Sequence, residues 1–219
     1  IEKREEKSAN NGSDQTLRNT ELSTKSMETK SIQEQLLNYF QSVQKISEKE
    51  ERVLSELCLH QDIQKNAELQ PIGYTCKTIY FVAKGMLRIC YLKNGVDITE
   101  SFEPENTIVA RAESLFAGIP SKKAICAVED SEVIAINAER LYALFDTYPN
   151  LERLFRKVFE QQYVRTIHRL ESLQFNTPEE RYQHLLEDHP NILLRAPLKH
   201  VATYLGITQV SLSRIRARK

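Results

Sequence analysis

Residues 78–102 read TIYFVAKGMLRICYLKNGVDITESF, and their pattern is the clearest indication of the fold. β-Branched and aromatic residues are frequent in it, and apolar residues alternate with polar ones on both sides of Asn94-Gly95. An Asn-Gly pair between two such runs is the strongest short-range signal for a β-hairpin, because both residues tolerate the positive φ of a tight turn. The stretch therefore predicts two antiparallel strands that meet at Asn94-Gly95.

Three further short strands are predicted after the hairpin. They are expected at Thr107–Val109, Ala124–Val128 and Glu132–Ile136, with turn-like segments between them. Several short strands at this spacing are typical of an antiparallel sandwich or barrel. Helical patterns flank them on both sides, so the expected fold class is α+β.

The flanking helices are marked by periodicity and caps. Apolar residues recur every three or four positions in Ser31–Val43, which predicts a helix. Ser47 and Glu50 have the form of a capping box that opens a second helix. After the strands, Asn137 is placed to cap a helix that ends before Pro149.

A long helix is predicted from about Asn150 to Leu173, because apolar residues form a broad face along it. At 1.5 Å per residue it would be roughly 36 Å long, which exceeds what a small sandwich can cover. Two interpretations remain open. The face packs on the sandwich, or part of it pairs with the same helix of a second copy across a two-fold axis.

The C-terminal stretch has the helix start and stop signals of a helix-turn-helix. A helix begins at Thr177-Pro178, the next opens at Pro197, and Gly206 ends it. Ala202 is the small residue that the crossing of two helices needs, Gly206 suits the sharp corner, and Thr208 can cap the last helix.

The last helix is expected to bury its apolar residues and to offer its polar ones. Val210, Leu212 and Ile215 are available for burial, although Val210 would be an awkward residue in a groove. From His189 to Lys219 there is no acidic residue, which is typical of a module that binds a polyanion. Gln suits adenine, and Arg suits guanine or phosphate. The predicted DNA-contacting residues are Lys199, Thr208, Gln209, Ser211, Ser213, Arg214, Arg216 and Arg218. The alternative is a helix that only packs.

Residues 197–216, PLKHVATYLGITQVSLSRIR, resemble the terminal helix-turn-helix of the Crp/Fnr family of bacterial transcription regulators. The resemblance extends over Ser31–Lys219, and TPEERYQHLLEDHPNILLRAPLKHVATYLGIT is most similar to the short Bacteroidetes-type members. It implies a homodimer that binds a pseudo-palindromic operator in double-stranded DNA. It also implies a cyclic-nucleotide-binding-like antiparallel β jelly-roll sensor domain (31–149), a dimerisation helix (150–174) and an all-α helix-turn-helix domain (175–219). Composition adds two expectations: residues 1–30 form a disordered leader, with Met27 as a candidate start, and a polar N-terminus with widely spaced cysteines indicates a cytoplasmic protein.

The sequence departs from the family pattern in its recognition helix. The usual Arg-Glu pair is replaced by Gln209 and Val210, while the later Arg is matched by Arg214. Without the Glu that accepts from cytosine, the half-site should differ from the best-known one. Because the sequence ends soon after this helix, we expect no full wing.

The sensor domain also departs from the family's cyclic-nucleotide site. By position, the Gly-Glu pair is replaced by Val109 and Ala110, and the Arg-Ser/Thr pair by Lys122 and Lys123. A lysine lacks the arginine fork, so cyclic AMP binding in the usual mode is not expected. The candidate effector-binding residues are Arg111, Glu113, Lys122 and Lys123. Arg111 and Glu113 either pair with each other or line a remodelled pocket, and the two lysines attract an anion or are solvated.

No cofactor, metal or catalytic activity is expected. The four cysteines stand far apart, His60 is a single histidine, and His184 and His189 do not share a helix face. No G-x-S-x-G or phosphate-cradling glycine-rich loop occurs, so an enzyme is not predicted. No apolar run reaches the roughly 20 residues that span a bilayer. The alternative function is a jelly-roll module that binds a small molecule or partner without specific DNA binding.

Overall fold

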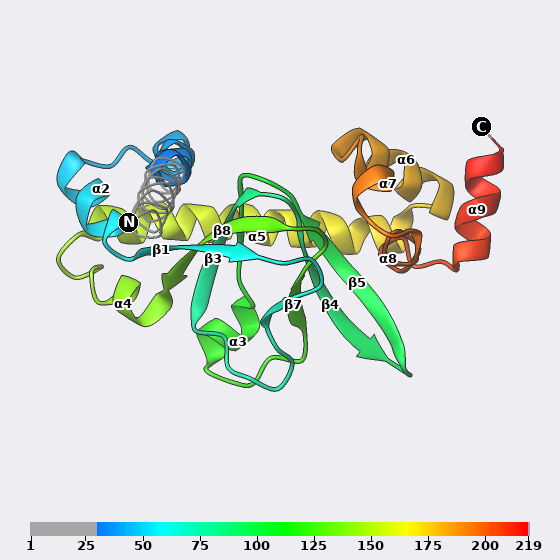
Figure 1. Ribbon diagram of the computed structural model, residues 1–219, viewed down its shortest axis with the longest axis horizontal. Helices are drawn as coiled ribbons and strands as arrows, with labels where there is room; N and C mark the ends of the chain where they lie inside the picture. Colours follow the sequence, from blue (N-terminus) through cyan, green and yellow to red (C-terminus); the bar gives the residue numbers. More distant parts are fainter. Residues whose placement is uncertain (1–29, 219) are drawn as a thin grey trace, which may run out of the picture.

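The computed structural model describes residues 30–218 (Figure 1). The predicted leader lies outside this range except for its last residue, Lys30, which is already helical. Two four-stranded antiparallel sheets form the centre of the molecule, in the orders β1-β8-β3-β6 and β2-β7-β4-β5. The strands are β1 (Cys58–Ile63), β2 (Glu68–Gln70), β3 (Thr78–Lys84), β4 (Leu87–Lys93), β5 (Val96–Glu103), β6 (Thr107–Val109), β7 (Ala124–Ala127) and β8 (Ser131–Asn137).

The predicted hairpin is confirmed as β4 and β5. Lys93 pairs with Val96, and the turn residues Asn94 and Gly95 have φ values of 52° and 77°. The three shorter strands are confirmed as β6, β7 and β8. Strands β1 and β2 were not predicted, and neither was the break at Gly85 that divides residues 78–93 into β3 and β4. β1 is an edge strand that carries a polar run, His60-Gln61-Asp62, which hides the alternation that a half-buried strand usually shows.

The two sheets enclose a jelly-roll-like core, and helices cover the outer face of the first sheet. Val82, Leu87, Ile125 and Val133 are fully buried between the sheets. On the outer face, the aromatic rings of Phe40 and Phe155 lie 5.3 Å apart, and both residues belong to the cluster that includes Phe81 of β3. The N-terminal helix (residues 30–43) supplies Phe40, and the long helix α5 supplies Phe155.

Caps fix two of the shorter helices around the sheets. In α2 (Glu48–Ser55) the capping box predicted between Ser47 and Glu50 is confirmed. The side chain of Asn137 caps α4 (Ala138–Tyr142), as expected. The short α3 (Ala112–Ala117) was not predicted, because its N-cap position is Arg111, which makes no capping bond.

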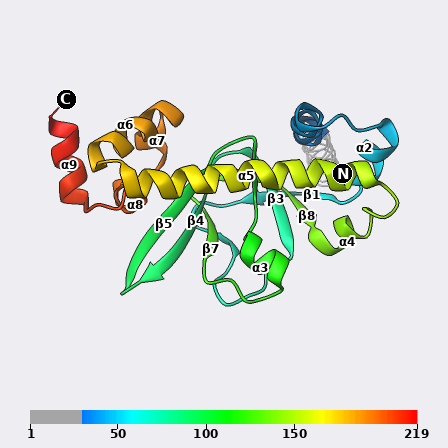
Figure 2. The ribbon, with the colours of Figure 1, turned by 180° about the vertical axis from the view of Figure 1, so that it is seen from behind.

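Helix α5 (Pro149–Phe175) runs along the whole molecule and connects the sheets to the terminal helices (Figures 1 and 2). Its 27 residues correspond to about 40 Å at 1.5 Å per residue. Only the first half has buried side chains, namely Leu151, Leu154, Phe155 and Val158. The second half exposes large apolar residues, which are Tyr163, Val164, Leu170, Leu173 and Phe175. Packing on the sandwich therefore accounts for half of the predicted apolar face.

Four helices follow α5: α6 (Pro178–Asp188), α7 (Ile192–Arg195), α8 (Leu198–Tyr204) and α9 (Gln209–Ala217). We call them the terminal helices. Their core is continuous with the sheets, because Met86, Phe102 and Val128 belong to the same buried cluster. Thr177 and Glu180 form a capping box at α6, and Thr208 caps α9, both at the expected positions. The single turn α7 was not predicted.

Within residues 30–218, no helix has the length and the apolar character that crossing a membrane requires.

Candidate functional sites: the last helix, the joints and a cavity

Helices α8 and α9 meet at a corner that contains Gly206. Gly206 has a φ of +69°, a left-handed conformation that favours glycine. The Ile207 N–H donates to the Ala202 carbonyl at 3.0 Å, and Ala202 is buried at the contact between the two helices. The corner therefore closes as the residue types predicted.

Helix α9 buries one face and exposes the other. Leu212 and Ile215 are buried in the core of the terminal helices, as expected. Val210 is 62% exposed, so the expectation that it is available for burial is wrong. It lies on the opposite side from Leu212 and Ile215, because successive residues on a helix are 100° apart. Gln209, Ser213 and Arg214 share the exposed surface with Val210.

The other predicted DNA-contacting residues have different surroundings. Thr208 accepts from the Ser211 N–H at 3.1 Å, and the two hydroxyls also bond at 3.0 Å. Lys199 and Arg216 are exposed on α8 and α9. Arg218 forms an ion pair with Glu179 of α6 at 3.5 Å. The capping hydroxyls and Arg218 therefore already have partners within the protein.

Two arginines hold the end of α8. Arg169 of α5 donates to the Tyr204 carbonyl and lies over the Tyr204 ring, 3.8 Å from its centroid. Arg181 of α6 donates to the Leu205 carbonyl at 2.9 Å. These bonds satisfy carbonyls that the last turn of a helix leaves without partners. Burial lowers the pKa of Arg169. Sequence reasoning did not single out either arginine, because their partners are backbone atoms distant in sequence.

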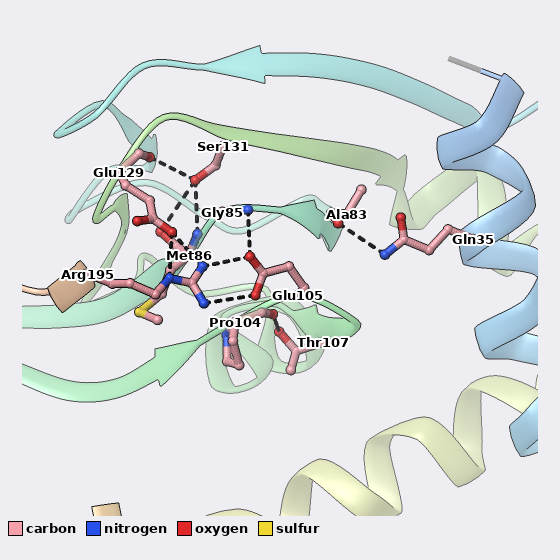
Figure 3. Close-up of polar contacts among 10 residues, drawn as sticks. All are labelled: Gln35, Ala83, Gly85, Met86, Pro104, Glu105, Thr107, Glu129, Ser131 and Arg195. Carbon is pink, nitrogen blue, oxygen red and sulfur yellow. Dashed lines mark hydrogen bonds and ion pairs between the residues drawn. The ribbon is translucent and has the colours of Figure 1, made fainter. Parts of the chain in front are cut away.

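Arg195 of α7 joins the terminal helices to two loops of the jelly roll (Figure 3). Its guanidinium donates to both carboxylate oxygens of Glu105, at 3.0 and 2.6 Å, and to Glu129 at 2.9 and 2.5 Å. Glu105 also accepts from the Gly85 N–H at 3.0 Å. Burial acts to raise the pKa of Glu105, but its bond to Arg195, the Arg195 charge and backbone hydrogen bonds together lower it below the ordinary value. We call this group the Arg195 joint.

A second joint connects β5 to α8. The Thr203 hydroxyl accepts from the Thr99 N–H at 3.1 Å. Beside it, Asp97 makes two bonds to Arg88, at 2.7 and 2.6 Å. His200 of α8 lies 4.0 Å from Asp97, and burial together with the charge of Arg88 lowers the His200 pKa to about 4. His200 is therefore neutral at pH 7.

A cavity of about 1100 Å³ lies between the jelly roll, α5 and the terminal helices. Residues from β5, β6, α3, α5 and α6 line it, together with Tyr204 of α8. Two buried charged residues belong to its wall, Glu103 at the end of β5 and Arg111 before α3. The size is sufficient for a small-molecule ligand.

The four candidate effector-binding residues differ in whether they line this cavity. Arg111 and Glu113 both line it and are not paired with each other within residues 30–218, which favours the pocket interpretation. Lys123 lines it too, but its ammonium forms an ion pair with Glu100 and lies 5.7 Å from the centroid of the Tyr91 ring. Lys122 is exposed and is not part of the lining. The two lysines therefore do not form one anion site.

His60 belongs to a cluster at the β1–β8 edge, which the sequence did not predict. Its Nε2 lies 3.6 Å from Asp62 and 3.5 Å from Glu132. Lys84 pairs with the other oxygen of Glu132 at 3.0 Å. His60, Asp62 and Glu132 could hold a metal ion, and Glu132 is already paired with Lys84.

Comparisons with known proteins agree with this architecture. Residues 61–148 match the family described as Cyclic nucleotide-binding domain. FixK2 from Bradyrhizobium japonicum has a similar structure, with a TM-score of 0.65 and 18% identity over 74% of this chain and 83% of that chain. A Crp/Fnr-family transcriptional regulator from Eubacterium rectale has a TM-score of 0.63 and 16% identity over 79% and 83%. The c-di-GMP responsive regulator CLP from Xanthomonas campestris has a TM-score of 0.62 and 17% identity over 76% and 88%. A search of the curated proteins gives no match.

The family match covers the strands β2 to β8 and the helices α3 and α4. The whole chain has an α+β fold similar to that of these solved regulators, so the fold that the resemblance implied is confirmed.

Proposed function

We propose that this protein is a homodimeric, sequence-specific DNA-binding transcription regulator of the Crp/Fnr type that acts in the cytoplasm. The observation that carries the proposal is the surface of α9. This capped helix follows a glycine corner, is anchored by two buried apolar residues, and presents Gln209, Ser213 and Arg214 to solvent. A polar helix face held rigidly in this way suits insertion into a major groove. No catalytic step is proposed.

The second half of α5 is proposed to pair with the same helix of a second copy. Tyr163, Ile167 and Leu170 are spaced by four and three residues, which is the spacing of a coiled-coil seam. Tyr163 and Leu170 are exposed, and nothing within residues 30–218 covers them. Pairing about a two-fold axis would bury this face and present two copies of α9 to successive major grooves, about 34 Å apart.

Base readout is assigned to Gln209 and Arg214, and phosphate contact to Lys199 and Arg216. To contact a phosphate, Arg218 would have to break its ion pair with Glu179. The Thr208 and Ser211 hydroxyls would have to break the hydrogen bond between them before bonding to DNA. Ser213 is exposed and available to either kind of contact. The proposed operator is pseudo-palindromic, because the two-fold symmetry of a dimer requires two related half-sites.

Cyclic AMP binding in the usual mode is proposed to be lost. At the positions compared with the usual Gly-Glu and Arg-Ser/Thr pairs, Val109 is an apolar residue buried in β6, and the charge of Lys123 is paired with Glu100. Lys122 is exposed away from the cavity. A cyclic phosphate in the cavity would therefore find neither an arginine fork nor an unpaired lysine at these positions, because Lys122 is not part of the lining.

Selection from a randomised duplex library tests the DNA-binding proposal. We expect enrichment of a two-fold symmetric site, with an affinity that falls steeply as salt rises. Arg214→Ala should weaken binding to that site by about 1–3 kcal/mol and relax the preference at one base pair of each half-site. The matched control is Arg140→Ala on α4, which should change neither.

The possible results separate the two candidate functions. If no sequence is enriched and no duplex binds, the proposal fails, and the alternative of a jelly-roll module that binds a small molecule or partner is favoured. If Arg214→Ala weakens all duplexes equally, Arg214 contacts phosphate rather than a base.

Sedimentation at micromolar concentrations tests the dimer. Leu170→Glu should convert the dimer to a monomer, while Leu92→Glu, which changes an exposed leucine on β4, should leave it intact. A wild-type protein that sediments as a monomer both with and without operator would remove the dimer from the proposal.

A further inference from the structure

Two cysteines that are 36 residues apart in the sequence meet on one sheet. The sulfur atoms of Cys90 in β4 and Cys126 in β7 lie 3.4 Å apart, within reach of a hydrogen bond between the thiols. The two strands are neighbours in the sheet β2-β7-β4-β5, where Cys90 pairs with Ala124 and Arg88 pairs with Cys126. The two cysteines are therefore diagonal neighbours on one face of the sheet.

This face is the outer one. Ile89 and Ile125 are buried between the sheets, and successive residues of a strand point to opposite faces. Cys90 and Cys126 follow them directly, so both point away from the sandwich. Together with Ala124 they form a small buried cluster of their own, separate from the larger cores. A small oxidant can therefore reach the pair from the surface side without entering the core between the sheets.

One thiol of the pair is suited to react with an oxidant. The thiolate is the reactive form of cysteine, and a neighbouring cation favours it. The hydrogen bond with Cys126 and the positive charge of Arg88 lower the pKa of Cys90, while burial acts in the opposite direction. The same hydrogen bond raises the pKa of Cys126. Cys90 is thus the nucleophile, and Cys126 is the thiol beside it.

The other two cysteines have different surroundings. The Cys58 thiol donates to the Leu54 carbonyl at 3.3 Å, and the Cys76 thiol donates to the Thr78 carbonyl at 3.4 Å. Burial raises the pKa of Cys58 to about 12. A buried cysteine often serves only as a small apolar residue, and these two fit that description. They are internal references for the reactivity of the pair.

From this geometry we propose that Cys90 and Cys126 are a reversible oxidation site, which a peroxide converts to a disulfide between β4 and β7. The Cys90 thiolate attacks one oxygen of hydrogen peroxide, the O–O bond breaks, and Cys90 becomes a sulfenic acid while hydroxide leaves. The Cys126 sulfur then attacks the Cys90 sulfur, the S–O bond breaks, and the S–S bond forms. The two thiol protons convert the hydroxides to water, and the peroxide takes both electrons.

Formation of this bond requires the strands to move. The sulfur atoms must approach by about 1.4 Å, from 3.4 Å to the disulfide length of about 2.0 Å. Diagonal neighbours on a sheet have Cα atoms about 7–8 Å apart, whereas a disulfide usually spans at most about 6.8 Å. The closed bond is therefore strained, and strained disulfides are the ones that thiols such as glutathione reduce readily.

The movement reaches the joint between β5 and α8. Cys90 pairs with Thr99 of β5, next to a register shift between Ile89 and Cys90. The Thr99 N–H donates to the Thr203 hydroxyl of α8 at 3.1 Å, so we expect movement of β4 at Cys90 to alter this bond. An effect on DNA binding would rest on the proposed DNA-binding function, whereas the disulfide itself does not.

Peptide mapping of the oxidised full chain tests the site. The reduced protein is treated with hydrogen peroxide without DNA, its remaining thiols are alkylated, and the digest is analysed by mass spectrometry without reduction. We expect one disulfide within the chain that joins the peptides of Cys90 and Cys126, with Cys58 and Cys76 alkylated. A glutathione buffer should then restore the thiols of the pair.

Variants and a second reagent separate the pair from the other thiols. Cys126→Ser should abolish the disulfide, so that peroxide carries Cys90 to the sulfenic acid and beyond. The matched control Cys58→Ala should form the disulfide at the wild-type rate. Phenylarsine oxide, which binds two adjacent thiols, should protect the wild-type pair from alkylation and should not protect Cys90 in Cys126→Ser.

Hydrogen exchange measures the expected movement. The Thr99 amide should exchange faster after oxidation of the wild-type protein, and its rate should not change in peroxide-treated Cys126→Ser. An unchanged rate in the oxidised wild type would overturn the link to α8.

Three results would overturn the oxidation site itself: peroxide leaves both thiols of the folded chain reduced, the mapped disulfide joins other cysteines or two chains, or glutathione does not reduce it. These results come from the wild-type chain, so a variant that fails to fold does not affect them. Because DNA is absent from the experiments, failure of the DNA-binding proposal would leave their outcome unchanged.

Discussion

Replacing Arg195 with methionine tests whether the Arg195 joint holds the terminal helices on the jelly roll. The guanidinium makes bonds to Glu105 and Glu129 at distances from 2.5 to 3.0 Å, and the three side chains are only 26%, 35% and 28% exposed. Arg195→Met removes all of these bonds and leaves two carboxylates facing each other, because both approach the same nitrogen, Nη2.

The size of the effect follows from partial burial. A hydrogen bond to a charged group contributes about 1.5–3 kcal/mol, and an exposed ion pair contributes about 1 kcal/mol or less. The Arg195 side chain is partly buried, so the contribution of each of its bonds lies between these limits. Because it bonds to two carboxylates, we expect Arg195→Met to reduce the free energy of unfolding by about 2–3 kcal/mol. With a urea m-value of about 2–3 kcal/mol/M, the midpoint should fall by about 1 M.

Urea unfolding and hydrogen exchange measure this effect. The control is Arg140→Met, an exposed arginine of α4, which should change the unfolding free energy by less than about 0.5 kcal/mol. In a cycle with Glu105→Gln, the double variant should show a coupling of about 1–2 kcal/mol. The Gly85 amide, which donates to Glu105, should exchange faster in Arg195→Met. If Arg195→Met costs no more than the control, the joint does not stabilise this arrangement, and our reasoning about it is wrong.

Three further predictions concern single residues. Gly85→Ala should destabilise the fold by about 2–4 kcal/mol in urea unfolding, because a Cβ would lie 2.4 Å from the Ser131 Oγ and the φ is +85°; a loss below about 0.5 kcal/mol would contradict the close contact. His200 should make stability pH-dependent, because its folded pKa of about 4 lies below the ordinary value of 6.5. The unfolded chain binds the proton first, so stability is complete above pH 6.5 and falls by up to about 3 kcal/mol as the pH drops towards 4. His200→Gln should flatten that slope, and an unchanged slope would assign it to other groups. Thr208→Ala removes the cap bond to the Ser211 N–H and should cost about 1 kcal/mol, measured by thermal unfolding, with Thr166→Ala on α5 as the control.

Local signals in the sequence were sufficient wherever the determining contacts lie within a few residues. The Asn94-Gly95 turn, the capping hydroxyls and the Gly206 corner each depend on neighbours in the chain, and the structure has them where they were expected. The sequence pattern did not predict β1, because its polar residues are typical of a loop and its strand conformation depends on pairing with β8. It failed also for Val210, because apolar character does not say which side of a helix meets the core.

The candidate sites divide in the same way. The polar residues that α9 exposes to solvent were predicted, because helical periodicity separates a buried face from an exposed one. By contrast, the contact of Arg195 with two loops and the position of Arg111 beside Glu103 in the cavity wall depend on residues far apart in the chain. The same holds for the Arg111 Nε–H, which has no acceptor among residues 30–218.

The hairpin, the caps, the corner at Gly206 and most of the strands and helices follow from the sequence alone, since they depend on backbone preferences and short-range hydrogen bonds. The elements β1, β2, α3 and α7 and the pairing of charges depend on the tertiary structure. Lys123 is paired with Glu100, Arg195 bridges Glu105 and Glu129, and the Arg111 Nε–H has no acceptor among residues 30–218. The physical reason is that a charge finds its partner in space rather than along the chain, and burial then fixes whether that pairing matters.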